Sequence, residues 1–582
     1  MRKQLEDLRR VMKDEGIDAY IIPTADFHGS EYVNEYFKCR EFVSGFTGSA
    51  GTLLVTSQWA GLWTDGRYFL QAEAQLSGSG IQLMREREPG VPAIDNFLKR
   101  ELSQGSCLGF DGRVVSFSEA ARFEDDFKLR WDIDLTEEIW SGRPKLCPSQ
   151  IYDIPLSVTG ETSESKLQRL RGVMKEKDAD MHLITSLEEI AWLYNLRGKD
   201  VEHTPVFFAF LLIEPEGERL FVLDSTFGDS SAASHLPATT KVLSYFRIFD
   251  ALGTLPAGRL LLSRERTSYA MVKSLPDSVE QVDTEDPAEM MKAIKNETEI
   301  GSTMEAHMRD GAAVTRFIYW LKSVVNFGGL LTEAGAANML LEFRRKQKGF
   351  DDLSFSTIAA YGANGAIVHY IPEPETCMTL QPEGFLLLDS GGQYDDGTTD
   401  ITRTIALGTL TEDMKRHYTL VLKSHIALAS ARFPEGTTGA QLDKIVRKPL
   451  ANEGLDFNHG TGHGVGHLLS VHEGPNKISP LGGVSIIREG MITSDEPGLY
   501  FEGQYGIRLE NEILCVRGKD GMLEFEPITW CPWEREAILP EMLTETEKSW
   551  LNNYHRKVYE KLQPLLDEET ADWLKTQTEI IY

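Results

Sequence analysis

Five side chains of the kinds that bind divalent cations lie in the last third of this chain: Asp389, Asp400, His463, Glu496 and Glu510. Four carboxylates and one imidazole make an oxygen-rich set that suits two adjacent divalent cations. The intervals between neighbouring members run from 11 to 63 residues (400 − 389 and 463 − 400), so folding must assemble the set. We therefore predict a two-metal site that does not reside in one local loop.

The two aspartates belong to the segment GFLLLDSGGQYDDGTTDITRT, residues 384–404. Its apolar start predicts a short buried strand with Asp389 at the end, where a bare carboxylate is costly unless it is paired or metal-bound. Glycines and then β-branched residues follow, which predicts a hairpin that brings Asp389 beside Asp400. Two carboxylates that close repel each other, and a cation between them relieves the repulsion. An acidic hairpin turn without metal is the plainer alternative for this segment alone.

Histidine and glycine are interleaved in HGTGHGVGHLLSVHEGP, residues 459–475. Glycine permits unusual backbone angles and close approach, which favours a binding loop over a helix face. The segment lacks the spacing of a dinucleotide loop and the lysine of a P-loop. We predict His463 as the metal ligand and His459 and His472 as residues that contact substrate. His467 is expected to be structural, with a hydrogen bond to the backbone.

The two glutamates lie in SDEPGLYFEG and YGIRLENEI. On a strand, the two-residue period places Arg508, Glu510 and Glu512 on one face, so that Arg508 would orient Glu510. Glu512 remains open as a rival ligand. Either glutamate alone would be read as a surface charge, and only the complete set favours Glu496 and Glu510 as ligands.

The elements that must position these residues include an internal repeat in the amino-terminal half. The helix-period segment 5–13 is echoed by 167–175, 162 residues later (167 − 5). In both copies an acidic residue, Asp18 or Asp180, precedes a strand-like run. A chance likeness of two amphipathic helices is the alternative, but the matched acid and strand favour duplication. We predict two similar α/β domains in tandem.

Composition shifts near residues 152–164 and 276–290 divide the chain into three predicted domains, 1–157, 158–288 and 289–582. The third begins with one long helical pattern from Met290 and then alternates helices with strands. From about residue 540 a three- and four-residue apolar period predicts a helical extension.

A length of 582 residues fits several domains and exceeds one core. The net charge of −29, from 60 basic and 89 acidic residues, disfavours binding to nucleic acid or to anionic membranes. The six cysteines are scattered without a CxxC pair, which fits a reducing compartment. The amino terminus is charged and amphipathic, unlike a secretory signal, and no apolar run approaches the roughly 18 residues of a membrane span. We therefore expect a cytoplasmic protein.

The segments FVSGFTGSAG, LWTDGRYFLQA, DGTTDITRT, HGTGHGVGH and EPGLYFEGQYGIRLEN together identify a family resemblance. The third domain resembles the pita-bread metallopeptidases, which include methionine aminopeptidase, prolidase and aminopeptidase P. Their ligand order Asp, Asp, His, Glu, Glu has a match at every position. Over the full chain, the sequence resembles the long, three-domain cytosolic aminopeptidase P. The resemblance implies an α/β (α+β) chain with two tandem creatinase-like domains followed by a pita-bread domain.

The resemblance also implies roles for individual residues. Asp389 would bind one metal, His463 and Glu496 the other, and Asp400 and Glu510 would bridge both. The implied catalytic residues are Glu496 as general base, with His369, His459 and His472 around the substrate. The predicted substrate-binding residues are Arg508, Glu31 and Arg67, the last two near the amino end of the substrate.

The implied activity is release of the amino-terminal residue from peptides that begin Xaa-Pro, with a homodimer expected from the family. The donor set favours two manganese ions, ahead of cobalt or zinc. Prolidase, which acts on Xaa-Pro dipeptides, is the nearest alternative, and the two extra domains argue against it. A non-catalytic pita-bread interaction module is the other alternative, and it is disfavoured because no ligand is missing.

Overall fold

The structure is a computed structural model that describes residues 2–228 and 231–582. The chain divides into two compact units: unit 1 holds Met1–Leu156 with Glu161–Glu289, and unit 2 holds Ser157–Gly160 with Met290–Tyr582. Both repeat copies fall within unit 1, so the predicted boundary at residue 157 stays a prediction. In the part of the chain that the structure describes, no helix combines the length and the apolar character needed to cross a bilayer.

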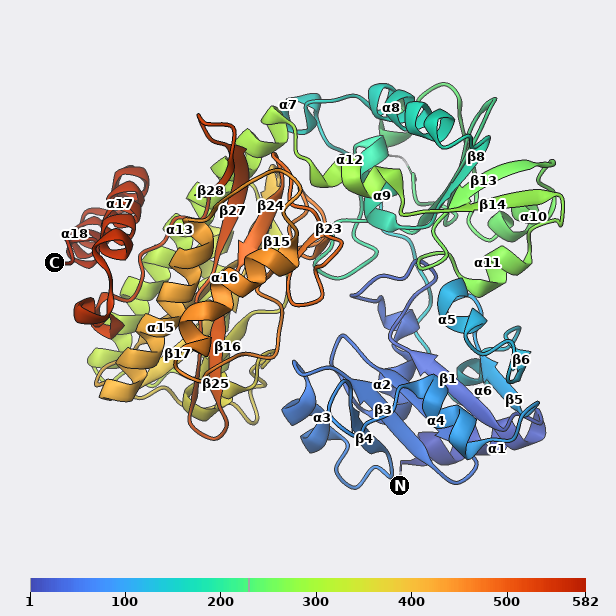
Figure 1. Cartoon of the computed structure of the whole chain (residues 1–582), viewed down its shortest axis with the longest axis horizontal. Coiled ribbons are helices and arrows are strands. Elements are labelled where there is room, and N and C mark those ends of the chain that lie inside the picture. The colour runs from blue at the N-terminus through green and yellow to red at the C-terminus, as the bar shows by residue number, and fades with distance from the viewer. Residues whose placement is uncertain (1, 229–230) are drawn as a thin grey trace. The chain divides into compact units, whose positions relative to one another are not determined.

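Unit 1 contains two six-stranded sheets with the same strand order (Figure 1). The first sheet has the order β4-β3-β2-β1-β5-β6 and the second β12-β11-β10-β8-β13-β14. The strands of the first are β1 (Ala19–Pro23), β2 (Thr52–Thr56), β3 (Ala60–Thr64), β4 (Gln82–Arg85), β5 (Cys107–Phe110) and β6 (Lys128–Arg130). Those of the second are β8 (Met181–Ile184), β10 (Ala209–Glu214), β11 (Gly217–Val222), β12 (Thr240–Ser244), β13 (Gly258–Leu262) and β14 (Val279–Asp283).

Helices accompany both sheets in a repeated pattern. Each copy opens with an amphipathic helix, α1 or α8, and the full set in unit 1 is α1 (Lys3–Asp14), α2 (Cys39–Ser44), α3 (Phe69–Gln75), α4 (Ile94–Glu101), α5 (Phe117–Ala121), α6 (Leu135–Ile139), α8 (Ser163–Glu176), α9 (Leu187–Tyr194), α10 (Arg247–Gly253) and α11 (Tyr269–Lys273). A small antiparallel pair joins β7 (Tyr152–Asp153), which precedes the second copy, to β9 (Leu196–Arg197), which lies within that copy. The predicted tandem α/β arrangement is confirmed.

The matched acidic residues of the repeat have matched hydrogen bonds. Asp18 Oδ2 accepts the N–H of Cys107 at 2.8 Å, and the N–H of Asp18 donates to the Cys107 carbonyl at 2.9 Å. Asp180 makes the same pair of bonds to Arg259, at 2.8 and 2.9 Å. Each acid therefore ties the start of its central strand to the parallel strand beside it, which explains why both copies retain it.

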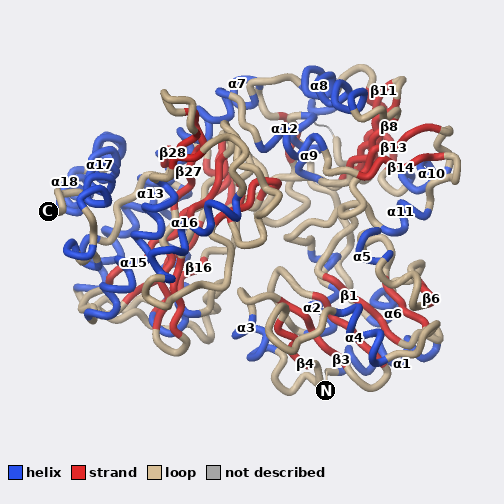
Figure 2. Tube along the Cα trace, viewed as in Figure 1, coloured by secondary structure: helices blue, strands red, loops and turns tan. Residues whose placement is uncertain are grey.

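Unit 2 surrounds its strands with long helices, and Figure 2 shows α13, α15 and α16 alongside the strands. The helices are α12 (Pro287–Ala293, entering from unit 1), α13 (Glu297–Asn326), α14 (Glu333–Arg345), α15 (Glu412–Ala429), α16 (Gly439–Ala451), α17 (Glu545–Leu562) and α18 (Glu568–Gln577); the short α7 (Leu156–Thr159) also lies at the boundary. The predicted continuous helix from Met290 is wrong, because Asn296 caps α13: its side chain accepts the N–H groups of Thr298 and Glu299.

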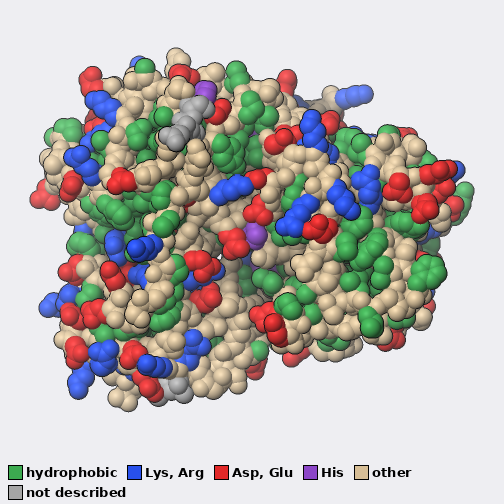
Figure 3. Space-filling model, turned by 180° about the vertical axis from the view of Figure 1, so that it is seen from behind, with side chains coloured by type: hydrophobic (Ala, Val, Ile, Leu, Met, Phe, Trp, Pro, Cys, Tyr) green, Lys and Arg blue, Asp and Glu red, His purple; other side chains and the backbone are tan. Residues whose placement is uncertain are grey.

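The strands of unit 2 form four sheets, ordered β16-β17-β20, β15-β18-β19, β25-β26 and β21-β28-β27-β24-β22-β23. Their bounds are β15 (Phe350–Leu353), β16 (Ile358–Tyr361), β17 (Phe385–Ser390), β18 (Gly392–Tyr394), β19 (Gly397–Thr398), β20 (Ile401–Ala406), β21 (Arg432–Phe433), β22 (Gly462–Gly464), β23 (Glu473–Ile478), β24 (Ile492–Asp495), β25 (Gly498–Phe501), β26 (Tyr505–Arg508), β27 (Asn511–Arg517) and β28 (Leu523–Pro527). On the face in view in Figure 3, acidic and basic side chains are interspersed.

Candidate two-metal active site

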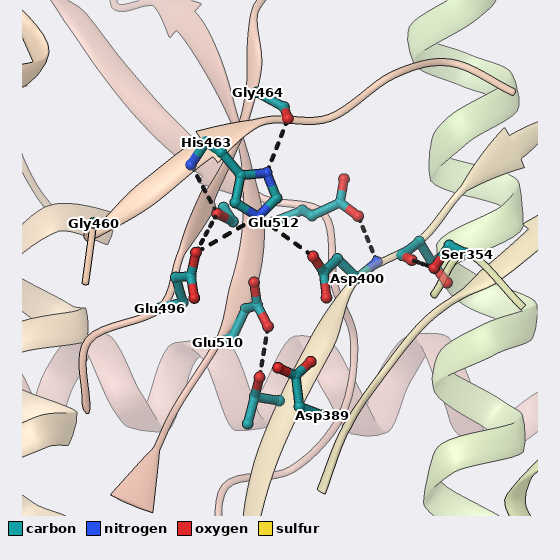
Figure 4. Close-up of polar contacts among 12 residues, drawn as sticks. Ser354, Asp389, Asp400, Gly460, His463, Gly464, Glu496, Glu510 and Glu512 are labelled. Atoms are coloured by element: carbon teal, nitrogen blue, oxygen red, sulfur yellow. Dashed lines mark hydrogen bonds and ion pairs between the residues drawn. The ribbon is translucent and has the colours of Figure 1, made fainter. Parts of the chain in front are cut away.

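The five predicted metal ligands come together in unit 2, where Figure 4 shows their side chains facing one another. Ligand atoms of Asp400, His463 and Glu510 all lie within 4.8 Å of one another. The Nε2 atom of His463 lies 3.5 Å from Asp400 Oδ2 and 3.5 Å from Glu496 Oε1. Asp389 belongs to the same group, since its charge acts on both Asp400 and Glu510. Residues far apart in the sequence thus form one acidic cluster.

Strand ends position the cluster. Strands β17 and β20 pair antiparallel with Asp389 opposite Thr402, so Asp400, which directly precedes β20, lies beside the end of β17. The predicted hairpin is confirmed. Glu496 follows β24, and Glu510 lies between β26 and β27. Side chains at the ends of paired strands have little freedom, which suits a site that must hold its ligands in one geometry.

The tautomer of His463 follows from its second nitrogen. Nδ1 lies 2.9 Å from the carbonyl of Gly464, which can only accept, so Nδ1 carries the proton. In the neutral imidazole Nε2 therefore holds the lone pair, and this atom faces the carboxylates of Asp400 and Glu496. A lone pair that faces two carboxylates is repelled unless a cation lies between them, and this arrangement is the one that metal-binding histidines adopt.

The electrostatics of the carboxylates fit bound cations. Burial, followed by the charges of Asp389 and Glu496, raises the pKa of Asp400 well above its usual range. Burial and the neighbouring carboxylates raise the pKa of Glu510 in the same way, and burial also raises the pKa of Glu496. The Oδ1 atoms of Asp389 and Asp400 are buried and lack a hydrogen-bond partner within the described residues. Divalent cations would neutralise this charge and bind these oxygens.

The prediction that one strand carries Arg508, Glu510 and Glu512 on the same face is wrong. Strand β26 ends at Arg508 and pairs with β25, whereas β27 begins at Asn511 in a different sheet. The guanidinium of Arg508 binds Asp389 Oδ2, at 2.6 Å from Nη2, so Asp389 is the carboxylate that it orients. Glu510 instead accepts a hydrogen bond from the Thr402 hydroxyl at 2.7 Å.

The rival ligand Glu512 has other partners. Its Oε1 atom accepts the N–H of Asp400 at 2.7 Å, and Oε2 lies 3.1 Å from Nε2 of His307 on α13. Both oxygens are therefore directed at protein groups, and the side chain is buried. We interpret Glu512 as a residue that holds the backbone of Asp400 and leaves the metal to the other carboxylates.

A hydrogen-bonded chain joins His459 to the cluster through Tyr500, which the sequence did not indicate. Nδ1 of His459 lies 2.7 Å from the Gly460 carbonyl, so Nε2 accepts from the Tyr500 hydroxyl at 2.7 Å. Burial raises the pKa of Tyr500 to about 12, which keeps the phenol protonated. Arg508 Nη1 donates to the same hydroxyl oxygen at 2.9 Å. In the sequence, Tyr500 is distinguished only by its place four positions after Glu496. Tyrosines are also common on surface strands, so this place did not indicate a role.

The other predicted histidines take separate positions. The ring of His472 packs edge-to-face on that of His463, with centroids 4.4 Å apart. His369 is half-buried in the connection between β16 and β17. His467 is buried, and its Nδ1 lies 3.0 Å from the Thr303 hydroxyl on α13. This bond is to a side chain, whereas the sequence predicted a hydrogen bond to the backbone. The substrate roles of His369, His459 and His472 stay predictions.

Glu31 and Arg67 lie in unit 1. Arg67 Nη1 is 3.5 Å from Glu31 Oε1, and Arg67 binds Asp65 more closely, with Nη2 2.8 Å from Oδ2. This pairing orders the two side chains without assigning them a ligand. Their contact with the amino end of a substrate stays a prediction.

Comparisons with known proteins place the chain in a family. Residues 302–517 match metallopeptidase family M24 and residues 521–581 match the C-terminal region of that family. Residues 4–144 and 142–299 each match a creatinase/prolidase N-terminal domain. The predicted fold class, two creatinase-like domains followed by a metallopeptidase domain, is thereby confirmed.

Full-length relatives agree. A probable Xaa-Pro aminopeptidase P of Coprinopsis cinerea is 38% identical, with 99% of this chain and 98% of that protein covered. Aminopeptidase P2 of Arabidopsis thaliana is 40% identical, with 99% of this chain and 88% of that protein covered. The solved X-prolyl aminopeptidase of Caenorhabditis elegans, described as a cytosolic enzyme with a di-nuclear active site, matches with a TM-score of 0.95 at 32% identity over 100% of this chain and 99% of that one. The chain belongs to metallopeptidase family M24, among the Xaa-Pro aminopeptidase P proteins.

Proposed function

We propose that the protein is a two-metal aminopeptidase that releases the first residue from peptides with proline in the second position. The observation that carries this proposal is the cluster of four carboxylates and one histidine, in which Asp389, Asp400 and Glu510 are buried and two carboxylate oxygens lack a hydrogen-bond partner within the described residues. The relatives named probable Xaa-Pro aminopeptidase P and aminopeptidase P2, which match this chain over nearly its whole length, support the same activity.

The proposed metal ligands are Asp389 for one ion, His463 and Glu496 for the other, and Asp400 and Glu510 between them. When bound, two such cations lower the pKa of a water molecule and polarise the substrate carbonyl. Manganese is the proposed metal because oxygen-rich sites with one imidazole suit it, ahead of cobalt or zinc.

The protein's own groups would handle the protons and the developing charge. Glu496 lies at the edge of the cluster beside His463, and we assign it as the general base that later protonates the leaving nitrogen. His472, whose ring contacts that of His463, would donate to the carbonyl oxygen as negative charge develops there. Nε2 of His459 accepts a hydrogen bond from the Tyr500 hydroxyl, and we assign this histidine to relay a proton towards the leaving group.

Selectivity for proline would depend on a feature of the bond itself. The Xaa-Pro amide has no N–H, so peptidases that grip an amide hydrogen cannot use it. A pocket formed near His369 and His459 would recognise the ring instead. Arg508, with Glu31 and Arg67 at the amino end of the substrate, completes the proposed substrate contacts.

Prolidase activity is the second candidate, because prolidases share this ligand set. The end-to-end match to aminopeptidase P proteins favours the aminopeptidase. A purely non-catalytic module is disfavoured by the presence of all five ligand residues. A homodimer in the cytosol completes the proposal, on the resemblance to the long aminopeptidases and to the cytosolic nematode enzyme.

Hydrolysis of an Xaa-Pro-Yaa tripeptide, an Xaa-Pro dipeptide and a tripeptide without proline, each with and without manganese, tests the proposal. We expect cleavage of the proline tripeptide, stimulated by manganese. Cleavage of the dipeptide alone would assign the protein as a prolidase. Equal cleavage of the peptide without proline would reject the proline selectivity.

A further inference from the structure

The connection that carries His369 is unusually long for the strands that it joins. Strands β16 and β17 are antiparallel neighbours, with Tyr361 opposite Leu386, yet residues 362–384 separate them. Hairpin loops between such neighbours commonly have about 2–5 residues, and much longer ones are functional or disordered. Ordering this connection costs conformational entropy, so interactions elsewhere must hold it in place.

One buried carboxylate gathers this connection. Glu333, the first residue of α14, is 0% exposed. Its Oε1 accepts the N–H of Tyr361 at 2.6 Å, and both oxygens lie 3.0 Å from Nδ2 of Asn364. Its Oε2 accepts the Tyr370 hydroxyl at 2.8 Å and the N–H of Met378 at 2.7 Å. The donors come from both ends and the middle of the connection, so a single side chain fixes its course.

The charge of Glu333 suits this task. Ionised acceptors form stronger hydrogen bonds than neutral ones, and the position at the N-terminus of α14 favours a negative charge. The N–H of Glu333 also donates to the Met378 carbonyl at 3.0 Å, which makes that contact reciprocal. Burial and the bond to Glu333 raise the pKa of Tyr370, so its hydroxyl stays a donor.

The anchored connection lies against the strands that carry other site residues. Tyr370, the neighbour of His369, packs with Tyr500 on one small apolar cluster of Ile358, Ala360 and Leu387. The turn η3 (Gly362–Ala366) packs on β26: a Cβ at Gly506 would come within 1.7 Å of the Gly365 carbonyl oxygen. No side chain fits between these backbones, so a shift of the connection would be transmitted to its other residues, including His369.

We infer that Glu333 is a positioning residue for His369. Its carboxylate holds residues 362–378 of the connection in place beside β26, and the neighbouring Tyr370 fixes the backbone from which the histidine projects. The inference rests on the proposed function, in which His369 contacts the substrate. Glu333 itself acts through the connection, and nothing in the assignment requires it to touch substrate or metal.

The first test replaces Glu333 by glutamine, which keeps the size and removes two of the four acceptor lone-pair positions. We expect faster amide hydrogen exchange across residues 362–378, a fall of at least about tenfold in kcat/KM for an Xaa-Pro-Yaa peptide and an unchanged metal content. Glu342→Gln is the matched control on the same helix, since its exposed carboxylate pairs only locally with Arg345. Unchanged exchange and activity within twofold of the wild type would overturn the inference.

A double variant separates positioning from general structural damage. If Glu333 acts through His369, Glu333→Gln with His369→Ala should be no slower than His369→Ala alone. Additive losses would overturn the inference. If Glu333→Gln does not fold, Tyr370→Phe removes one of the four donors and should give a smaller loss with the same exchange pattern. A wild-type protein that leaves Xaa-Pro peptides intact would reject the proposed function, whereas the exchange measurement alone would still decide whether Glu333 orders this connection.

Discussion

The metal ligands and the substrate histidines of unit 2 are held in different ways. Asp389, Asp400 and Glu510 are buried at the ends of paired strands, whereas His369, His459 and His472 are half-buried in connections. Strand pairing fixes the carboxylates, and their mutual repulsion favours bound cations. Each histidine instead depends on a second residue: Tyr500 bonds His459, Glu333 gathers the connection of His369, and Glu473, which follows His472, binds Lys292 and Lys295.

In this site the strand ends supply the metal ligands, whereas contacts within the connections position the residues that would contact substrate. The strand-borne carboxylates would fail by losing metal. The loop-borne histidines would fail by losing position while metal stays bound. Variants in the two regions should therefore separate metal content from turnover.

Glu510→Gln tests the strand-borne region and should have the largest effect. The amide removes a charged ligand, so we expect kcat/KM to fall by at least about a thousandfold and bound metal to fall below two ions per chain. The Thr402 hydroxyl can still donate to the amide oxygen, so the fold should persist, as circular dichroism would show. Glu512→Gln is the control and should retain metal. Loss of metal in Glu512→Gln but not in Glu510→Gln would show that the wrong glutamate is assigned.

Tyr500→Phe tests the loop-borne region. It removes the hydroxyl that links His459 to Arg508, so we expect a loss of about tenfold to hundredfold in kcat/KM with both metals retained. Tyr505→Phe removes a comparable tyrosine–histidine bond, to His417, and should leave turnover unchanged. Equal losses in the two variants, or loss of metal in Tyr500→Phe, would break the distinction between the regions.

Glu473→Gln tests how the segment after His472 is held. The change removes the carboxylate that two buried lysines bind, and breaking such a pair costs about 3–5 kcal/mol of unfolding free energy. We expect that loss in chemical denaturation, with a fall in kcat/KM of only severalfold. Adding Lys295→Met removes one buried ammonium and should restore part of the stability. If the double variant is no more stable than Glu473→Gln, other groups balance the charges of the lysines.

The strand-borne region also has a buried support that titrates. Arg403 donates to the Glu510 carbonyl at 2.6 Å and stacks on Trp533 at 3.7 Å. The backbone N–H of Trp533 in turn donates to Nε2 of His555 on α17, at 3.2 Å. Burial, followed by the charge of Arg403, lowers the pKa of His555 to about 3. This histidine must therefore be neutral in the folded protein.

Acid should weaken this support, which is the smallest of the expected effects near neutral pH. Below pH 6.5 the unfolded chain binds a proton at His555 that the folded protein excludes. The contribution of neutral His555 to the free energy of unfolding is fully present above that pH. It is lost as the pH falls towards 3, at roughly 1.4 kcal/mol per pH unit. His555→Asn keeps an acceptor and should flatten the pH dependence measured by urea unfolding between pH 6.5 and 5. An unchanged slope would show that His555 does not contribute.

Local patterns in the sequence predicted much of the fold. The duplication was readable because Asp18 and Asp180 each make the same two hydrogen bonds, one through the side chain and one through the N–H, to the neighbouring parallel strand, and so the acid stands at the same place in both copies. The hairpin of Asp389 and Asp400 was readable because an apolar run, turn glycines and β-branched residues follow in order. The resemblance then supplied a complete ligand set.

Other features were not readable because they depend on contacts at long range. The two-residue period continues through Arg508, Glu510 and Glu512, although the chain changes sheets between β26 and β27. The helical period likewise continues through Asn296, where a capping box begins a new helix. Glu333 reads as an ordinary residue at a helix start, because its donors lie up to 45 residues away.

Elemental analysis of the purified protein, reconstituted with manganese and freed of excess metal, tests the central claim most directly. We expect two bound ions per chain in the wild type and fewer than two in Glu510→Gln. A wild-type chain that retains no metal under these conditions would contradict the account.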